Sequence, residues 1–541
     1  MIDANPAPSR RAGPPLVVLG LDAFEVEWLH RWIREGRLPF LASLMARGTF
    51  APVVSSAFAD APWPSMFSGT TPGQHAFHTH LCLRRGTYRI ERTDARWCRQ
   101  PPFWSRLRGT GLRAAVVDVP KTFPIDGIEG VQVCGWGEHY PLLRRPESHP
   151  PGLIADLVRR FGAYPHIDET TVPPSRRWER RTLRAFLENV ERRTRAVEHL
   201  LDAGAWDLFF AVFSEIHYAE HQFIHLADET HWAFDPAAPQ ELRAAFPDVT
   251  SRVDAALERI CRRLPAGANL VVLSVHGMKP NYSGNFLVET FLQRLGVMTP
   301  APPTPPDGAV GALLYRTRQL RSLIPPPVRG FINRRLLSPG VHDRAMADAF
   351  AAAADWPRTQ AFMLPSDHFQ AFISLNLKGR EPQGTVEPGA EERVLARRLR
   401  AEFLRLVNLE TGRPAVAAVE WVPDHHPGAH TRDLPDLVVH WSHDAPIERV
   451  EHPELGRFEG PPQPLRKSQH TARGFLVGAG PAFASGAQVD ELDTVEIAPT
   501  LLRLLGLPAD PGMDAGPRLD LIARASDQGG ELALTSASAA P

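Results

Sequence analysis

The sequence predicts an α/β fold with an open, mostly parallel sheet. From residue 16 to about residue 290, short β-branched or aromatic runs alternate with longer amphipathic segments that carry Arg and Leu, which is the pattern of βαβ units. Several of the apolar runs end at an Asp or a His, and strands of such a sheet end on one common edge, where ligands bind. The length of 541 residues predicts two or more domains, or one large core with insertions.

The first half of the chain gives the strand and helix signals in order. Leu16–Asp22 is a strand-like apolar run that ends at a carboxylate. Apolar residues at helical spacing follow in Glu25–Gly48, and Gly36 and Pro39 interrupt them. The later elements expected in this half are strands at Ala114–Val119, Val131–Cys134, Leu208–Phe213 and Leu270–Val275, and a helix at Arg180–Leu201.

The second half contains a proline-rich segment that interrupts this pattern. Prolines cluster between about residue 298 and residue 345, and they oppose regular structure, so we expect an insertion or cap on the parent domain there. The fold would span residues 16–523, between a disordered N-terminal arm (1–15) and a disordered tail (524–541). The elements expected after the insertion are strands at Phe372–Leu375 and Leu437–Val439 and helices at Glu391–Leu406 and Glu496–Leu505.

The composition is that of a folded protein with balanced charge. The formal net charge is −1 and the Arg pairs are scattered, so the chain lacks the concentrated basic face that binds nucleic acid. No stretch approaches the ~18 apolar residues of a membrane span, and no apolar core of a secretory signal is visible. The four cysteines lack the close pairing of a zinc knuckle. We therefore expect a cytoplasmic protein with no nucleic-acid partner and no membrane span; its oligomeric state is unknown.

Four apolar runs, far apart in the chain, lie beside side chains that bind metals. Asp22 ends the first run, and His217 and His221 follow the second. His276 ends the third run, and His470 precedes the fourth. Asp and neutral imidazole are ligands for zinc-like divalent ions. Because the ends of parallel strands meet at one edge, the pattern predicts a metal-dependent enzyme.

The segments around these residues resemble the alkaline phosphatase superfamily, in particular its type I phosphodiesterase/nucleotide pyrophosphatase branch. The resemblance covers nearly the whole chain and rests, in order, on "VVLGLDAFEVEWLHRWIREGRLPFLASLMARGTFAPV", "APWPSMFSGTTPGQHAF", "FSEIHYAEHQFIHL", "LSVHGM", "SQHTARGFLVGAGPAF" and "EIAPTLLRLLGL". It implies a large α/β/α sandwich with two metal ions at the strand ends. The substrate that it implies is a small-molecule phosphate ester.

The resemblance places one metal ion on three histidines. Members of the family bind this ion through an Asp and a His four residues apart and through a late His. His217, His221 and His470 fall at those positions, and His217 stands where the family usually has Asp. Three imidazoles with one open position are a known zinc arrangement. We therefore expect a divalent metal, zinc, at this site.

At the second metal and the nucleophile, the chain departs from the family pattern. Asp22 and His276 match two ligands of the second ion, but Val275 stands where the family has a paired Asp. The usual Thr or Ser nucleophile would lie at Ala59, with Asp60 the next residue along. These departures predict a weak or absent second ion and no obvious alkoxide for covalent catalysis.

Asp60 is open to two interpretations. It precedes Pro62 at the start of an apolar turn, a good position for capping a helix through its side chain. Alternatively, it projects toward the metals as a replacement ligand or catalytic base, at the helix end that favours an anion.

Other polar residues near the motifs have weaker claims. Glu215 would lie on the side of His217 if the preceding strand continued, and would then hold an imidazole or face solvent. Lys279 and Asn281 lie on a loop after His276, where they would bind an anionic oxygen of the substrate or form a solvated turn. Ordinary loop or core roles are expected for the remaining clustered histidines, which are His75, His78, His80, His425, His426 and His430.

Three functions are consistent with these features. The first is a metal-dependent hydrolase of phosphodiesters, phosphomonoesters or pyrophosphates, in which hydroxide attacks directly because no side-chain nucleophile is present. The second is a pseudoenzyme that keeps the fold and one ion as a binding module. The third is a phosphotransferase, with the proline-rich insertion setting the choice of substrate.

Overall fold

The structure is a computed structural model, which describes residues 13–55, 58–137, 142–143, 145–165, 175–302, 339–366, 370–460 and 467–522. These residues form two compact units. The first unit is built from the described parts of Met1–Thr71, Cys98–Pro280 and Leu465–Pro541, and the second from those of Pro72–Trp97 and Asn281–Pro464. Each unit therefore contains segments that are far apart in the sequence.

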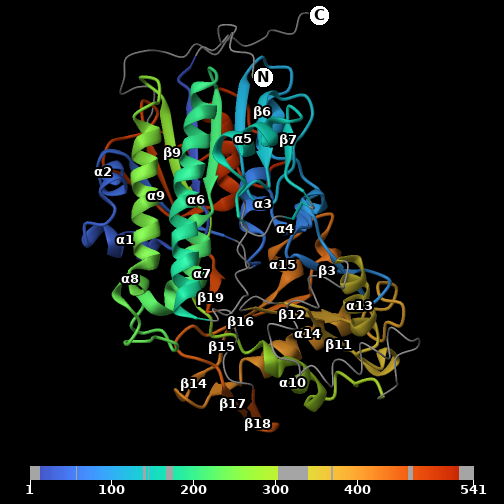
Figure 1. The fold of residues 1–541 in the computed structure, drawn as a ribbon. Coiled ribbons are helices and arrows are strands. Elements are labelled where there is room, and N and C mark those ends of the chain that lie inside the picture. The colour runs from blue at the N-terminus through green and yellow to red at the C-terminus, as the bar shows by residue number, and fades with distance from the viewer. Residues whose placement is uncertain are drawn as a thin grey trace, which may run out of the picture. The chain divides into compact units, whose positions relative to one another are not determined.

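A ten-stranded sheet forms the centre of the first unit (Figure 1). Its order is β21 (Ala487–Gln488), β2 (Thr49–Val54), β20 (Arg473–Ala479), β9 (Asn269–Ser274), β1 (Leu16–Leu21), β8 (Leu208–Phe213), β5 (Arg113–Val117), β6 (Glu129–Cys134) and β7 (Glu147–His149), and β22 (Leu492–Asp493) also pairs with β2. The five strands from β9 to β6 run parallel, whereas β20 and β7 are antiparallel to their neighbours. The predicted open, mostly parallel sheet is confirmed.

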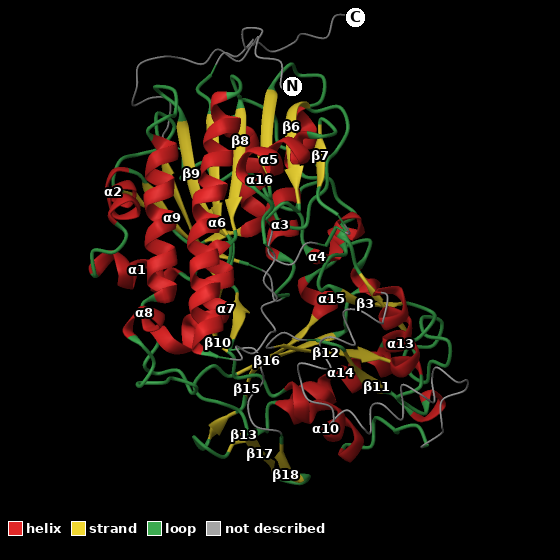
Figure 2. Ribbon diagram, in the orientation of Figure 1, coloured by secondary structure: helices red, strands yellow, loops and turns green. Residues whose placement is uncertain are grey.

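Both faces of this sheet are covered, which explains why its strands are apolar throughout. Val17 and Leu19 of β1 face one hydrophobic core, and Leu16 and Val18 face the other. Figure 2 shows the long helices α6 and α9 lying along the sheet. The first core receives α1 (Val26–Arg34), α2 (Pro39–Arg47), α5 (Leu153–Phe161), α6 (Arg176–Asp202), α7 (Glu215–Ala227), α8 (Gln240–Arg243) and α9 (Ala245–Cys261), and the second receives α3 (Pro62–Ser68) and α16 (Ile497–Leu504). The predicted α/β/α sandwich is therefore confirmed.

The second unit is built around antiparallel strands (Figure 2). Its larger sheet has the order β11 (Ala361–Leu364), β12 (Gln370–Leu375), β16 (Leu437–Trp441) and β15 (Val416–Trp421). A smaller sheet has the order β14 (Arg413–Pro414), β13 (Val407–Asn408), β17 (Arg449–His452) and β18 (Gly456–Glu459). A separate hairpin consists of β3 (Leu81–Arg84) and β4 (Arg89–Arg92). The α-helices among the described residues of this unit are α4 (Pro72–His75), α10 (Val288–Arg294), α13 (Pro339–Ala351), α14 (Ala390–Phe403) and α15 (Val422–His425).

The predicted strands and helices reappear with ends shifted by a few residues, and Glu25–Gly48 divides into α1 and α2 around Gly36 and Pro39 as its breakers indicate. Most of the predicted insertion at about 298–345 lies outside the described residues, as do most of the N-terminal arm and all of the tail. These boundaries stay predictions. In the part of the chain that is described, no helix combines the length and apolar character needed to cross a bilayer.

Candidate metal centre

Three neighbouring strands deliver candidate metal ligands to one edge of the sheet. β9, β1 and β8 lie side by side and run parallel, so their carboxyl ends coincide. Asp22 directly follows β1, and His276 lies two residues beyond β9. After β8 the chain turns at once into α7, which carries His217 in its first turn. The convergence expected from the sequence therefore occurs.

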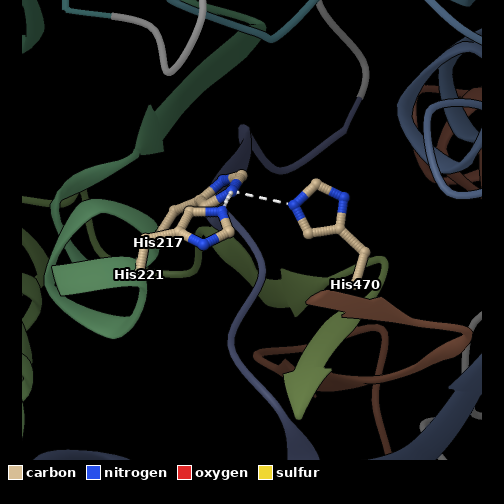
Figure 3. Close-up of side chains that lie close together, drawn as sticks. All are labelled: His217, His221 and His470. Atoms are coloured by element: carbon tan, nitrogen blue, oxygen red, sulfur yellow. Dashed lines mark hydrogen bonds between the residues drawn. The ribbon is translucent and has the colours of Figure 1, made fainter. Parts of the chain in front are cut away.

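The three histidines of the candidate site come from a helix and from a short two-stranded sheet. Because residues four apart lie on one face of a helix, α7 presents His217 and His221 together. His470 lies in β19 (Ser468–Thr471), which pairs antiparallel with β10 (Gly277–Pro280) and places His470 opposite Met278. Figure 3 shows the three rings turned toward one another.

The three rings meet through their Nε2 atoms. The Nε2 atom of His217 lies 3.1 Å from that of His221 and 2.9 Å from that of His470, and the three rings are buried. The ligand atoms of all three residues lie within 4.8 Å of one another. A tetrahedral zinc ion with Zn–N bonds of ~2.05 Å holds its nitrogens about 3.3 Å apart. The two measured separations lie within a few tenths of an ångström of this value, and the third pair of ligand atoms lies within 4.8 Å, so the donor set is of the right kind for a zinc-like ion.

Hydrogen bonds to the Nδ1 atoms orient two of the three imidazole rings. The Nδ1 atom of His217 lies 2.7 Å from Asp22 Oδ2, which accepts its proton, and Trp63 Nε1 donates to Asp22 Oδ1 at 2.7 Å. The Nδ1 atom of His221 lies 2.7 Å from Ser468 Oγ. A proton held on Nδ1 leaves the Nε2 lone pair available for a cation. Asp22 thus positions His217, and its proposed role as a ligand of a second ion stays a prediction.

His276 lies beside this cluster and is neutral at ordinary pH. Its Nε2 atom is 3.6 Å from Asp22 Oδ1, and its ring stacks on that of His470 with the ring centroids 4.9 Å apart. Burial lowers the pKa of His276 to about 3, against the opposing charge of Asp22. Its buried Nδ1 atom has no hydrogen-bond partner among the described residues. A neutral imidazole is the form that binds a cation.

Asp60 forms an ion pair instead of a helix cap, so the predicted capping role is wrong. Helix α3 begins at Pro62, as the proline indicates, but its N-cap is Ala61 and no side chain caps it. The Nζ atom of Lys121 donates to Asp60 Oδ1 at 2.5 Å and to the Asp60 carbonyl at 2.6 Å. A full positive charge is a stronger partner for the carboxylate than a backbone N–H group. Asp60 as metal ligand or base stays a prediction.

Glu215 does not hold an imidazole from a continued strand, because the chain is helical from Glu215 onward. Its Oε1 atom instead accepts from Arg193 Nε at 2.8 Å and from the Tyr164 hydroxyl at 3.0 Å. Lys279 pairs with Glu27 at 2.9 Å, and Asn281 Oδ1 accepts from the Ser283 amide at 3.1 Å within the second unit. The substrate-binding roles predicted for Lys279 and Asn281 remain untested.

The clustered histidines elsewhere have local partners. In the second unit, His75 Nδ1 accepts from the Phe77 amide at 3.1 Å, and His426 pairs with Glu420 at 3.0 Å. His78 and His80 precede β3 and do not lie within it. Among the described residues, His217, His221 and His470 form the one group of three or more metal-binding side chains in reach of a common ion.

Lys121 is the residue that the sequence interpretation missed. It follows β5, which ends at the same edge of the sheet as β8. The strand-end rule that selected Asp22 and His276 would have selected it too, had it been applied to lysine as well as to metal ligands.

His225, one turn beyond His221 on α7, predicts a pH dependence of stability. Burial, reinforced by the charge of Lys467, lowers its pKa from 6.5 to about 3. Between these two values the unfolded chain holds a proton that the folded chain lacks, so stability is complete above pH 6.5 and falls as the pH drops toward 3. We expect His225→Gln to flatten this slope by at most about 1.4 kcal/mol per pH unit in urea unfolding.

The matched control is His425→Gln, because His425 is exposed. It should leave the slope unchanged. An identical slope in His225→Gln and the wild-type protein would contradict the assignment.

Comparison with known proteins gives the family. Residues 16–460 match the family described as type I phosphodiesterase/nucleotide pyrophosphatase. Comparison with curated proteins finds no significant match. Among solved structures, murine ectonucleotide pyrophosphatase/phosphodiesterase 5 is 13% identical, with a TM-score of 0.46 over 94% of this chain and 100% of its own. Phosphonoacetate hydrolase from Sinorhizobium meliloti 1021, in complex with phosphonoformate, is 14% identical, with a TM-score of 0.47 over 91% of this chain and 96% of its own.

The family match covers most of the chain, including Asp22, His217, His221 and His276. The chain therefore belongs to the type I phosphodiesterase/nucleotide pyrophosphatase family of the alkaline phosphatase superfamily.

Proposed function

We propose that this protein is a metal-dependent hydrolase of phosphate esters that works with one zinc-like ion. The observation that carries the proposal is the convergence of three buried Nε2 atoms, from His217, His221 and His470, with two of the rings oriented from behind. Three histidines and an open fourth position are the usual arrangement of a catalytic zinc site. The family of metal-dependent phosphoester hydrolases to which the chain belongs supports the same chemistry.

A divalent ion, when bound, neutralises negative charge on a phosphate ester and brings the pKa of a coordinated water to about 7. Side chains around the three histidines orient the ligand atoms that would hold this ion. Asp22 holds the Nδ1 proton of His217, so that the Nε2 atom faces inward. His276, buried and neutral, adds no competing positive charge.

Water replaces a side-chain nucleophile in this proposal. Residue 59, where the family resemblance places the nucleophile, is a buried alanine, and a methyl group cannot attack phosphorus. Asp60, whose carboxylate is held by Lys121, is our candidate for the base that takes a proton from the attacking water. In direct attack, the water oxygen would form a bond to phosphorus as the bond from phosphorus to the leaving-group oxygen breaks, and no covalent enzyme intermediate would form.

The test is hydrolysis of nitrophenyl phosphate mono- and diesters by protein loaded with Zn²⁺, Mn²⁺ or Fe²⁺. We expect turnover that disappears on chelation and returns with one equivalent of metal per chain. Activity that survives both His221→Ala and His470→Ala would rule the proposal out.

A binding module without turnover is the second candidate, because Ala59 and Val275 both stand where the family places functional side chains. Tight, stoichiometric metal binding without hydrolysis across the whole ester panel would favour this candidate. Metal-dependent turnover of any of these esters would exclude it.

A further inference from the structure

Lys121 brings a positive charge to the edge of the sheet where the metal ligands meet. β5 lies next to β8 in parallel register and ends at Val117, so the loop that carries Lys121 leaves the sheet at the ligand edge. Its ammonium binds Asp60, which lies two residues before the helix whose Trp63 donates to Asp22. Asp22 in turn accepts from Nδ1 of His217 at 2.7 Å, so Lys121 is linked to the metal ligands through Asp60, the start of α3 and Asp22.

The loop holds Lys121 in a backbone conformation that residues with a Cβ atom rarely adopt. The φ angle is +65° at Lys121 and +51° at Asp118. Asp118 is fixed by the amides of Trp136 and Gly137 at 2.9 and 2.8 Å and by Arg193 Nη1 at 2.9 Å. Unfavourable backbone that the surroundings enforce in this way is typical of functional positions.

The residues that would bind a second ion are incomplete beside this lysine. Val275 and Ala59 offer no ligand atom, and both oxygens of Asp22 already accept hydrogen bonds from His217 and Trp63. Sites that transfer phosphoryl groups place cationic groups, either metal ions or Lys and Arg side chains, against the negative oxygens of the phosphate. The ammonium of Lys121, with a side chain only 15% exposed, supplies a point charge suited to phosphate oxygens.

We propose that Lys121 is the anion-binding residue of this site and takes the electrostatic place of a second metal ion. It would bind the non-bridging oxygens of a phosphate ester and of the inorganic phosphate product. Asp60 holds the ammonium in the absence of the anion and competes with it for the charge. This inference rests on the proposed function, since it assigns the phosphate group of the same substrate.

The experiment measures the affinity of the zinc-loaded protein for inorganic phosphate by titration calorimetry. We expect Lys121→Met to weaken binding by about 10- to 100-fold, which is the value of one charged hydrogen bond, with zinc still bound at one equivalent. Asp60→Asn should tighten phosphate binding by about threefold or more, because it removes a competing negative charge. Lys121→Arg should restore part of the affinity.

Lys378→Met is the control, since Lys378 forms an ion pair of the same length, 2.5 Å, with Glu387 on an exposed surface of the second unit. It should leave phosphate affinity unchanged. A purely structural ion pair predicts that Lys121→Met and Asp60→Asn weaken binding alike, and that result would overturn the inference. Absence of phosphate binding in the wild-type protein, or equal affinity in Lys121→Met, would overturn it as well.

The two proposals fail in different ways. If the protein shows metal-dependent hydrolysis but its phosphate affinity does not depend on Lys121, this inference is wrong and the proposed function still holds. Phosphate binding that depends on Lys121, in a protein that hydrolyses none of the esters, would support the anion site and remove the hydrolase.

Discussion

Replacing His470 with alanine is expected to reduce bound zinc from about one ion per chain to nearly none and to lower ester hydrolysis by about 100-fold or more. His470 Nε2 lies 2.9 Å from His217 Nε2, so its loss leaves two imidazoles, fewer protein ligands than zinc normally keeps. Elemental analysis after dialysis and turnover of nitrophenyl phosphates measure the two effects. Zinc should also cease to raise the melting temperature, because an ion stabilises the fold only where the folded state binds it.

His225→Gln is the control for this experiment. His225 lies on the same helix as His221, one turn further on, and faces His231, with the ring centroids 6.1 Å apart. This variant should keep its zinc and its activity. Full zinc occupancy in His470→Ala would contradict the three-histidine site.

Replacing Arg193 with methionine is expected to lower the free energy of unfolding by ~3–5 kcal/mol, because it leaves buried carboxylates without their cation. Arg193 is fully buried and contacts Asp118 at 2.9 Å and Glu215 at 2.8 Å. Burial lowers the pKa of the Arg193 guanidinium, but Glu215, Tyr164 and Asp118 together raise it well above its usual value. Urea unfolding followed by circular dichroism measures the loss.

Arg259→Met gives the comparison for a half-exposed arginine. Arg259 is 40% exposed and pairs with Glu191 at 2.7 Å and Glu198 at 3.0 Å. Such pairs contribute about 0–1 kcal/mol. Equal losses in Arg193→Met and Arg259→Met would show that burial does not set the importance of Arg193.

The metal ligands could be predicted from the sequence because the ends of the strands could be predicted from it. Continuous apolar runs mark buried parallel strands, and such strands end together. That rule predicts Asp22, His217 and His276 at one edge of the sheet, and the structure places them there. His470 was predicted as a ligand from the apolar run that it precedes and from the family resemblance. Its pairing with β10 was not predicted, since a four-residue strand has no periodicity of its own.

Contacts that depend on the exact path of loops could not be predicted from the sequence. Lys121, which pairs with Asp60, has a left-handed backbone conformation that the residue type does not predict. Strand β2 was missed because Pro52 argues against a sheet interior. In the structure, β21 pairs with Thr49 and Phe50 and β22 with Val53 and Val54, so Pro52 falls in the gap between them and needs no amide proton on that side.

The position of β2 constrains how the protein is synthesised. The neighbours of β2 in the described sheet, β20, β21 and β22, come from residues 473–493, far later in the chain. During translation this strand waits for more than four hundred further residues with its amide and carbonyl groups unpaired. An exposed strand edge of this kind is a template for aggregation. Residues 49–54 therefore stay without their sheet partners until residues 473–493 have been synthesised.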